Sequence, residues 1–235
     1  MEYRIRNWGY AVTAALAVLA SGCQPGERQV ESAIRQELPR LVGPAASYEV
    51  DVSGISRTGA SRVSATGTRI RVPTAPVIDR AEVRLSDVAY SPARKEVQRI
   101  RSANATIRVL PGDLRSFLES NRSLQDVTLD LAAPDLATVR ARPQIAGLNL
   151  PPSAVVSLTG RLRPEGPTVR YEITEASAAG IPLPAQARAL ITRTINPVVD
   201  LSGMPLPLRV TAVRADPRGI TLDAAGELTS PIAVP

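Results

Sequence analysis

The sequence predicts an α+β fold, a single domain in which about three helices pack on a strongly curved antiparallel sheet. The length of 235 residues and the apolar content of 44% suit one domain with its own core. Most apolar residues alternate with polar ones at period two, which is the pattern of strands with one apolar and one wet face. A few short segments instead repeat apolar residues at helical spacing, and no low-complexity linker divides the chain.

The first 22 residues have the features of an export signal. Arg4 and Arg6 precede an uncharged run, residues 8–22, which is long enough for a signal-peptide core and short for a bilayer span. The run ends in small residues before Cys23, the sole cysteine, as in bacterial lipoprotein signals. We therefore expect removal of residues 1–22 and acylation of Cys23, which would place the chain in the cell envelope or periplasm on a lipid anchor. Ordinary cleavage that leaves a free thiol is the alternative.

The mature chain begins with a helix and continues with strands. After a linker over residues 23–28, Val30, Ile34 and Leu38 recur at helical spacing and predict a helix over 27–41. Period-two alternation then predicts strands that are separated by turn sequences. The strands are expected around residues 48–53, 63–72, 81–85, 96–110, 127–131, 139–141, 156–158, 169–173, 208–213 and 220–224. Residues 230–235 are expected to form a flexible tail.

Two further helices interrupt the strands. Pro111 and Gly112 open the first, with Asp113 as the N-cap and Phe117 on the inner stripe. The second begins near Pro184, because proline suits the first turn of a helix. It ends before Asn196-Pro197, and its inner face carries Leu190, Ile191 and Ile195.

The composition excludes most catalytic chemistry. The chain has no histidine, which excludes Ser-His-Asp and Cys-His nucleophile systems and His-based zinc sites. It also has no P-loop and no G-x-G-x-x-G motif. Asp126, Thr128 and Asp130 share a strand face and could ligate a cation, although a wet strand face explains them more simply. We expect no enzymatic activity, cofactor or metal, and a hydrolase that uses carboxylates alone is the enzymatic alternative.

The charge suits an anionic partner. The formal net charge is +6, and arginine carries it, since Lys95 is the only lysine. Aromatic residues make up 3% of the chain, too few for base-stacking platforms, and export also argues against a nucleic-acid partner. The arginines that alternate with apolar residues form either a solvated outer face or a surface for anionic lipid. They are Arg69, Arg71, Arg84, Arg108, Arg161, Arg163 and Arg170.

Three turns share the pattern Gly, apolar, any residue, Leu, Pro. They are GLNLPP from Gly147, GIPLPAQ from Gly180 and GMPLPL from Gly203. Connecting segments usually meet water and are polar, so apolar turns need an explanation. Their side chains either plug the core at the ends of strands and helices, or rim an apolar opening for acyl chains that stiff Pro backbone holds open. The sequence leaves both interpretations open.

Two stretches resemble the LmeA-like phospholipid-binding family of bacterial envelope lipoproteins. They are LSDVAYSPARKEVQRIRSANATIRVLPGDLRSFL, residues 85–118, and INPVVDLSGMPLPLRVTAVRAD, residues 195–216. Their most specific parts are a turn at 87–90, the strand over 99–108 with the short helix after it, and Asn196-Pro197. The resemblance runs from about Val30 to Leu228 and includes no catalytic signature. It implies an elongated, tubular architecture around an apolar tunnel, phospholipid binding, and a role in envelope lipid or glycolipid homeostasis.

These features together predict a lipid-anchored, non-enzymatic phospholipid-binding or transfer protein of the cell envelope. A monomeric domain over residues 29–229 would hold the acyl chains of a phospholipid or glycolipid in an apolar cavity. The alternative is a structural or adaptor envelope lipoprotein with a packed core, which acts through protein contacts. The candidate lipid-contacting residues come from the Leu-Pro turns and the two later helices: Leu148, Leu150, Ile181, Leu183, Met204, Leu206, Phe117, Leu190, Ile191 and Ile195.

Overall fold

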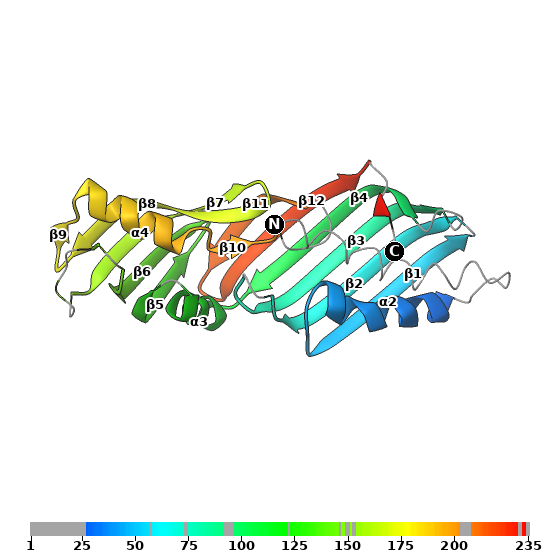
Figure 1. Cartoon of the computed structure of the whole chain (residues 1–235), viewed down its shortest axis with the longest axis horizontal. Helices are drawn as coiled ribbons and strands as arrows, with labels where there is room; N and C mark the ends of the chain where they lie inside the picture. Colours follow the sequence, from blue (N-terminus) through cyan, green and yellow to red (C-terminus); the bar gives the residue numbers. More distant parts are fainter. Residues whose placement is uncertain are drawn as a thin grey trace.

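The computed structural model describes residues 27–56, 58–72, 75–91, 96–121, 123–145, 147–148, 151, 154–202, 208–229 and 232–233. In this part of the chain, three helices and two open antiparallel sheets form a single domain. The sheets lie end to end and make the molecule elongated, with helix α2 beside the larger sheet and helices α3 and α4 beside the smaller one (Figure 1). The α+β class, the antiparallel pairing and the helices confirm the prediction, but two sheets replace the expected single one.

The larger sheet has seven strands in the order β1-β2-β3-β4-β12-β11, with β13 paired to β4. Strands β1 to β4 form a meander, and the hairpin of β11 and β12 adds to β4, which joins the C-terminal hairpin to the N-terminal meander. The strands are β1 (Ser47–Ser56), β2 (Gly59–Ile70), β3 (Ile78–Ser91), β4 (Glu96–Val109), β11 (Arg209–Asp216), β12 (Gly219–Leu228) and β13 (Ile232–Ala233). The last of these lies in the tail that the sequence predicts to be flexible.

The smaller sheet has six strands in the order β10-β8-β7-β6-β5, with β9 paired to β8. The predicted hairpin of β7 and β8 is confirmed, and it turns at Gly166, whose φ of 59° glycine adopts without strain. The strands are β5 (Leu124–Ala132), β6 (Leu136–Pro143), β7 (Val156–Glu165), β8 (Thr168–Ala178), β9 (Ile181–Pro182) and β10 (Val199–Asp200).

One edge strand of each sheet is covered by a helix. Helix α2 (Glu27–Leu41) packs on β1, and Glu31 Oε1 accepts a hydrogen bond of 3.2 Å from the backbone N–H of Val52. Helix α3 (Pro111–Asn121) packs on β5, and Glu119 Oε1 accepts one of 3.0 Å from the N–H of Val127. Because β1 and β5 are edge strands, each carboxylate satisfies a backbone group on the open side of its sheet.

The start of α3 differs from the prediction. The helix begins at Pro111, so Asp113 lies in its first turn and is not the N-cap. The Asp113 carboxylate instead accepts hydrogen bonds of 2.6 and 2.8 Å from the Arg69 guanidinium on β2. An anion is favourable at the start of a helix, and a two-pronged Arg–carboxylate pair is a strong contact. This partner is 44 residues away, so the local sequence pattern did not reveal it.

The segment 87–90 also differs, because it continues β3 and does not turn. Within this strand, Asp87 has a left-handed backbone conformation with a φ of 49°, which aspartate tolerates better than most residues.

Next to the junction of the two sheets lies Asp135, a residue of the smaller sheet's β5–β6 turn that is 8% exposed. Its carboxylate accepts hydrogen bonds from Arg161, at 2.6 Å, and Arg163, at 3.0 Å, both on β7. Backbone N–H groups of β11 in the larger sheet donate to the carbonyls of Gly166 and Pro134 in the smaller one, each at 2.7 Å. These two backbone hydrogen bonds connect the larger sheet to the smaller one.

Stability should be lost at alkaline pH through two tyrosines, the half-buried Tyr48 and the buried Tyr171. Burial raises the pKa of Tyr48 to about 12 from its ordinary value of 10.0, and it raises the pKa of Tyr171 as well. A pKa that is higher in the folded state means that the stabilisation is complete below pH 10 and is lost as the pH rises from about 10 through about 12.

We expect thermal melts to give a constant midpoint between about pH 6 and 9, because no histidine titrates there, and a falling one above about pH 10. The Tyr48→Phe variant is the control, and its midpoint should fall less steeply. A Tyr48 phenol that ionises near pH 10 in the folded protein would contradict this prediction.

Candidate functional site

The larger sheet has one apolar and one wet face, as the alternation predicts. Across β2, β3, β4 and β12, apolar residues stand opposite one another in adjacent rows. One row is Val63, Leu85 and Ala103, and the next is Ala65, Val83, Ala105 and Ala224. We call these seven residues the apolar sheet face. The opposite face carries polar side chains such as Arg84 and Asn104, which pair with each other in the register and are exposed.

Helix α2 covers one side of the apolar sheet face. Val30, Ile34 and Leu38 pack with residues of β1 and with Val63 and Ala65 of β2. Over β3, β4 and β12, the neighbouring apolar cluster contains no residue of a described helix. Ala103, Ala105 and Ala224 in the middle of this cluster are 2%, 3% and 3% exposed, whereas Val63, Val83 and Leu85 beside them are half-buried. The apolar sheet face therefore has α2 along β1 and β2, and no described helix in the apolar cluster over β3, β4 and β12.

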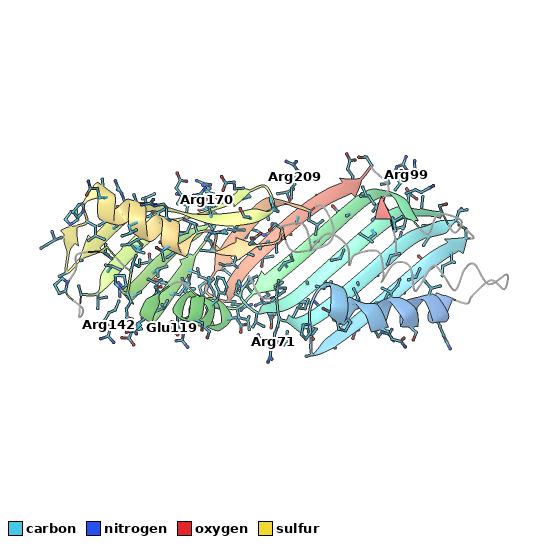
Figure 2. All side chains as sticks on the ribbon, in the orientation of Figure 1. Arg71, Arg99, Glu119, Arg142, Arg170 and Arg209 are labelled. Carbon is cyan, nitrogen blue, oxygen red and sulfur yellow. The ribbon has the colours of Figure 1, made fainter. Side chains whose placement is uncertain are left out.

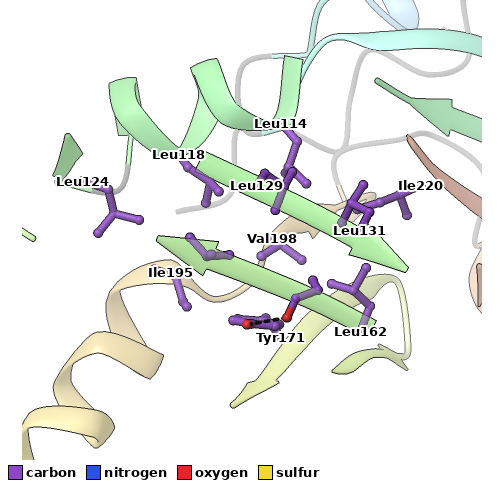
Figure 3. A pocket seen from close by; sticks show the side chains of 12 residues that line it. Leu114, Leu118, Leu124, Leu129, Leu131, Leu162, Tyr171, Ile195, Val198 and Ile220 are labelled. Atoms are coloured by element: carbon purple, nitrogen blue, oxygen red, sulfur yellow. Dashed lines mark hydrogen bonds between the residues drawn. The ribbon is translucent and has the colours of Figure 1, made fainter. Parts of the chain in front are cut away.

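The core of the smaller sheet is nearly filled. Leucine, isoleucine and valine side chains from α3, α4 and the sheet surround a cavity of about 20 Å³, which holds about one water molecule (Figure 3). Tyr171 lies at its edge, and its hydroxyl is 2.9 Å from the carbonyl of Ala137 and 2.8 Å from that of Leu158. Pockets for small organic ligands are ~300–1,000 Å³, so this cavity is far too small for an acyl chain.

An open groove of about 720 Å³ lies between helix α4 (Ala185–Ile195) and the hairpin of β7 and β8. Four arginines and two glutamates line it, together with small and apolar residues. The charged residues are Arg163, Glu165, Arg170, Glu172, Arg188 and Arg193. We call this the α4 groove. Its volume is in the range of ligand-binding sites, and its lining carries a net charge of +2 from four cations and two anions.

Asn196 holds α4 against the smaller sheet. Its Oδ1 accepts a hydrogen bond of 2.6 Å from the N–H of Tyr171, and its Nδ2 donates to the carbonyls of Tyr171 and Thr192, each at 3.0 Å. The side chain therefore pairs with β8 as another strand would, and it also caps the end of the helix. These contacts give a structural reason for asparagine at position 196.

The candidate residues of the helices lie mostly inside the smaller sheet's core. Ile191 and Ile195 are 0% and 2% exposed and belong to the main apolar cluster. Phe117 of α3 is buried, whereas Leu190 of α4 is half-buried. Lipid contact by these residues stays a prediction.

The described side chains of the Leu-Pro turns include both core-packed and solvent-exposed residues. Leu148 and Leu183 are half-buried and pack against the main apolar cluster. Ile181 is 71% exposed, at the end of the smaller sheet where Val155 is also exposed. Within the described part of the turn from Gly180, one side chain therefore points out while another packs inward. Leu150, Met204, Leu206 and Cys23 lie outside the described residues.

All seven of the arginines that alternate with apolar residues are exposed, and five of them pair with carboxylates. Arg71 and Arg170 are labelled in Figure 2. Arg170, for example, pairs with Glu165 at 3.2 Å, and Arg163 with Glu172 at 3.6 Å. These contacts support the solvated-face interpretation for most of the set. Asp126 of the possible cation site is also paired, with Arg142.

Sequence reasoning missed the α4 groove and its two helical arginines. The signal was present, because Ala185, Arg188, Ala189, Thr192 and Asn196 recur at the spacing of one helix face. The sequence predicted the apolar inner face of the same helix and gave no prediction for its second face. Only the fold shows that the hairpin of β7 and β8 lies opposite this face.

Among the described residues, no helix is both long and apolar enough to cross a membrane, and no group of three or more metal-ligating side chains comes together. A family model described as LmeA-like phospholipid-binding matches residues 24–225 of the chain. The comparison with curated proteins and the comparison with solved structures each gave no match.

Proposed function

The chain belongs to the LmeA-like phospholipid-binding family, and from this premise we propose that it is a lipid-anchored, non-enzymatic phospholipid-binding or transfer protein of the bacterial cell envelope. The family match carries the proposal of lipid binding, since it covers residues 24–225 of the 235 in the chain. The absence of histidine from the sequence supports a role without catalysis.

The acyl chains lie on the apolar sheet face, beside α2. Two observations support this placement. Apolar side chains stand in rows on β3, β4 and β12, and helix α2 packs along β1 and β2. Removal of apolar surface from water contributes about 25 cal/mol of binding free energy per Å². A lipid tail on such a face is therefore bound by the apolar area that it buries and needs no specific polar contact. The larger sheet curves around the tails, as in tubular lipid-binding proteins, and the protein acts as a monomer.

The anchor is an acyl group on Cys23, after removal of residues 1–22, and it holds the domain at a membrane of the envelope. The uncharged run after Arg4 and Arg6 and the small residues before the sole cysteine support this step.

Substitution of Cys23 by serine tests the anchor. The wild-type protein should partition into the detergent phase in Triton X-114 extraction, whereas the Cys23→Ser variant should move to the aqueous phase and lack the mass of the acyl groups. A wild-type protein without added lipid mass would contradict acylation of Cys23, and it would not affect the proposal that the domain binds phospholipid.

One observation favours a second candidate function, that of a structural or adaptor lipoprotein with a packed core. The cavity that α3, α4 and the smaller sheet surround is about 20 Å³, so this part of the core is nearly filled by its own side chains. Leu183→Asp separates the two functions, because it should cost stability and leave lipid uptake per folded molecule unchanged if Leu183 is a core plug.

Uptake of a fluorescent phospholipid by the purified protein tests the proposed function. Titration of dansyl-labelled phosphatidylethanolamine should give saturable fluorescence enhancement that unlabelled phospholipid competes away. Failure to enhance fluorescence at any protein concentration would favour the adaptor function.

A further inference from the structure

The α4 groove has a surplus of positive charge that the fold itself does not neutralise. Both of its glutamates have partners on the strands, Glu165 with Arg170 and Glu172 with Arg163. Arg188 and Arg193 of α4 line the same groove, are exposed, and form no ion pair with any residue of the described chain. The unneutralised charge therefore lies on the helix side of the groove.

The position of Arg188 has no structural benefit within the helix. It lies near the start of α4, where the partial positive charge of the helix N-terminus disfavours a cation. Arg193 lies in the last turn, where a cation is favourable, so its place has a local explanation. An exposed arginine at an unfavourable end, without a carboxylate partner among the described residues, is better explained by an anion that binds beside it.

The remaining lining leaves room for such an anion. Ala185 and Ala189 stand next to Arg188 on the same helix face, and their short side chains keep the groove wide at this point. Asn196 at the far end uses its amide in hydrogen bonds to Tyr171 and Thr192, which fixes the helix wall in place. The groove is thus held at a fixed width by the fold and does not depend on a ligand to form it.

We propose that the α4 groove binds the phosphate group of a second phospholipid, separate from the one whose acyl chains lie on the apolar sheet face, through Arg188 and Arg193. Guanidinium groups match phosphate oxygens in paired, charge-assisted hydrogen bonds, and two of them on one wall favour an anionic phosphate over a neutral headgroup. Ile173 and Pro164 line the same groove, so the glycerol part of the lipid meets apolar surface beside the phosphate. The choice of a lipid as the source of the phosphate rests on the proposed function, whereas the anion site rests on the groove alone.

Binding of three soluble probes to the full chain tests this proposal by isothermal titration. The probes are dihexanoyl phosphatidylglycerol, the matching diacylglycerol without phosphate, and glycerol 1-phosphate without acyl chains. The test variant is Arg188→Gln/Arg193→Gln, in which glutamine keeps the helix propensity and removes both charges. The control is Arg99→Gln/Arg209→Gln on the larger sheet, which removes two exposed arginines that have no carboxylate partner among the described residues (Figure 2).

We expect the test variant to bind phosphatidylglycerol roughly 10- to 100-fold more weakly than the wild type, with diacylglycerol binding unchanged. The control variant should bind both lipids as the wild type does. Equal affinity of the test variant and the wild type for phosphatidylglycerol would overturn the groove proposal and leave the proposed function intact.

The glycerol 1-phosphate arm separates the two proposals if the wild type binds neither lipid. In that case the proposed function fails, and binding of glycerol 1-phosphate that is lost in the test variant would support a site for free phosphate esters. Absence of that binding as well would overturn the groove proposal together with the function.

Discussion

The Ile191→Ala variant should lose about 2–5 kcal/mol of unfolding free energy, the usual cost of removing a large aliphatic side chain from a filled core. Ile191 is 0% exposed and connects α4 to the main apolar cluster of the smaller sheet. The cavity that Ile195 of the same helix lines is only about 20 Å³, so the core around α4 has little free volume there. Urea unfolding followed by circular dichroism measures the change.

Leu190→Ala is the matched control, because Leu190 is the adjacent residue on the same helix and is only half-buried. It should cost clearly less stability than Ile191→Ala, and both variants should take up phospholipid normally per folded molecule. An Ile191→Ala variant with wild-type stability and lost lipid uptake would mean that this side chain contacts lipid, as the sequence suggested, and is not a core residue.

The Leu85→Glu variant should lose lipid uptake by roughly tenfold or more, because a carboxylate on the apolar sheet face must be desolvated against acyl chains. Leu85 is half-buried and stands between Val63 and Ala103 in the register of the sheet. The glutamate can turn its carboxylate to solvent when no lipid is present, so we expect the fold to persist. Uptake is measured with dansyl-labelled phospholipid and normalised to folded protein.

Asn104→Glu is the control for charge, since Asn104 is exposed on the opposite face and pairs with Arg84 across the strands. It adds the same negative charge within the same pair of strands and should leave uptake unchanged. Equal uptake by Leu85→Glu and the wild type would show that acyl chains lie elsewhere. Equal loss in both variants would show that net charge, and not the apolar sheet face, controls uptake.

The strands and the helices followed from local patterns, because each depends on neighbours a few residues away. Alternation around Val83 and Ala105 predicted two strands with one apolar face, and the structure pairs these residues directly. The helical spacing of Val30, Ile34 and Leu38 predicted α2, which packs through those side chains.

The division into two sheets could not be predicted in the same way. It depends on contacts such as those of Asp135 with Arg161 and of β12 with β4, which join parts of the chain far apart in sequence. The bidentate pair of Arg69 and Asp113 is another such contact, and it shows why the predicted N-cap was wrong.

The candidate site was harder to predict than the fold because burial, and not residue type, separates a core residue from a lipid-contacting one. Ile181 and Ile191 are the same amino acid, yet one is 71% and the other 0% exposed. The arginines on the strands were candidates for lipid contact because they alternate with apolar residues, but most of them pair with carboxylates. Arg188 and Arg193 carry the surplus charge of the α4 groove, and their importance depends on a hairpin that comes from another part of the chain.

Extraction of noncovalent lipid from the purified protein tests most directly whether the domain holds phospholipid. The Cys23→Ser variant, exported and purified without detergent, removes the contribution of the anchor. Mass spectrometry of an organic extract should find phospholipid in an amount comparable to that of the protein, and much less from the Leu85→Glu form of the same variant. A lipid-free extract from protein that also fails to take up labelled phospholipid would contradict the account.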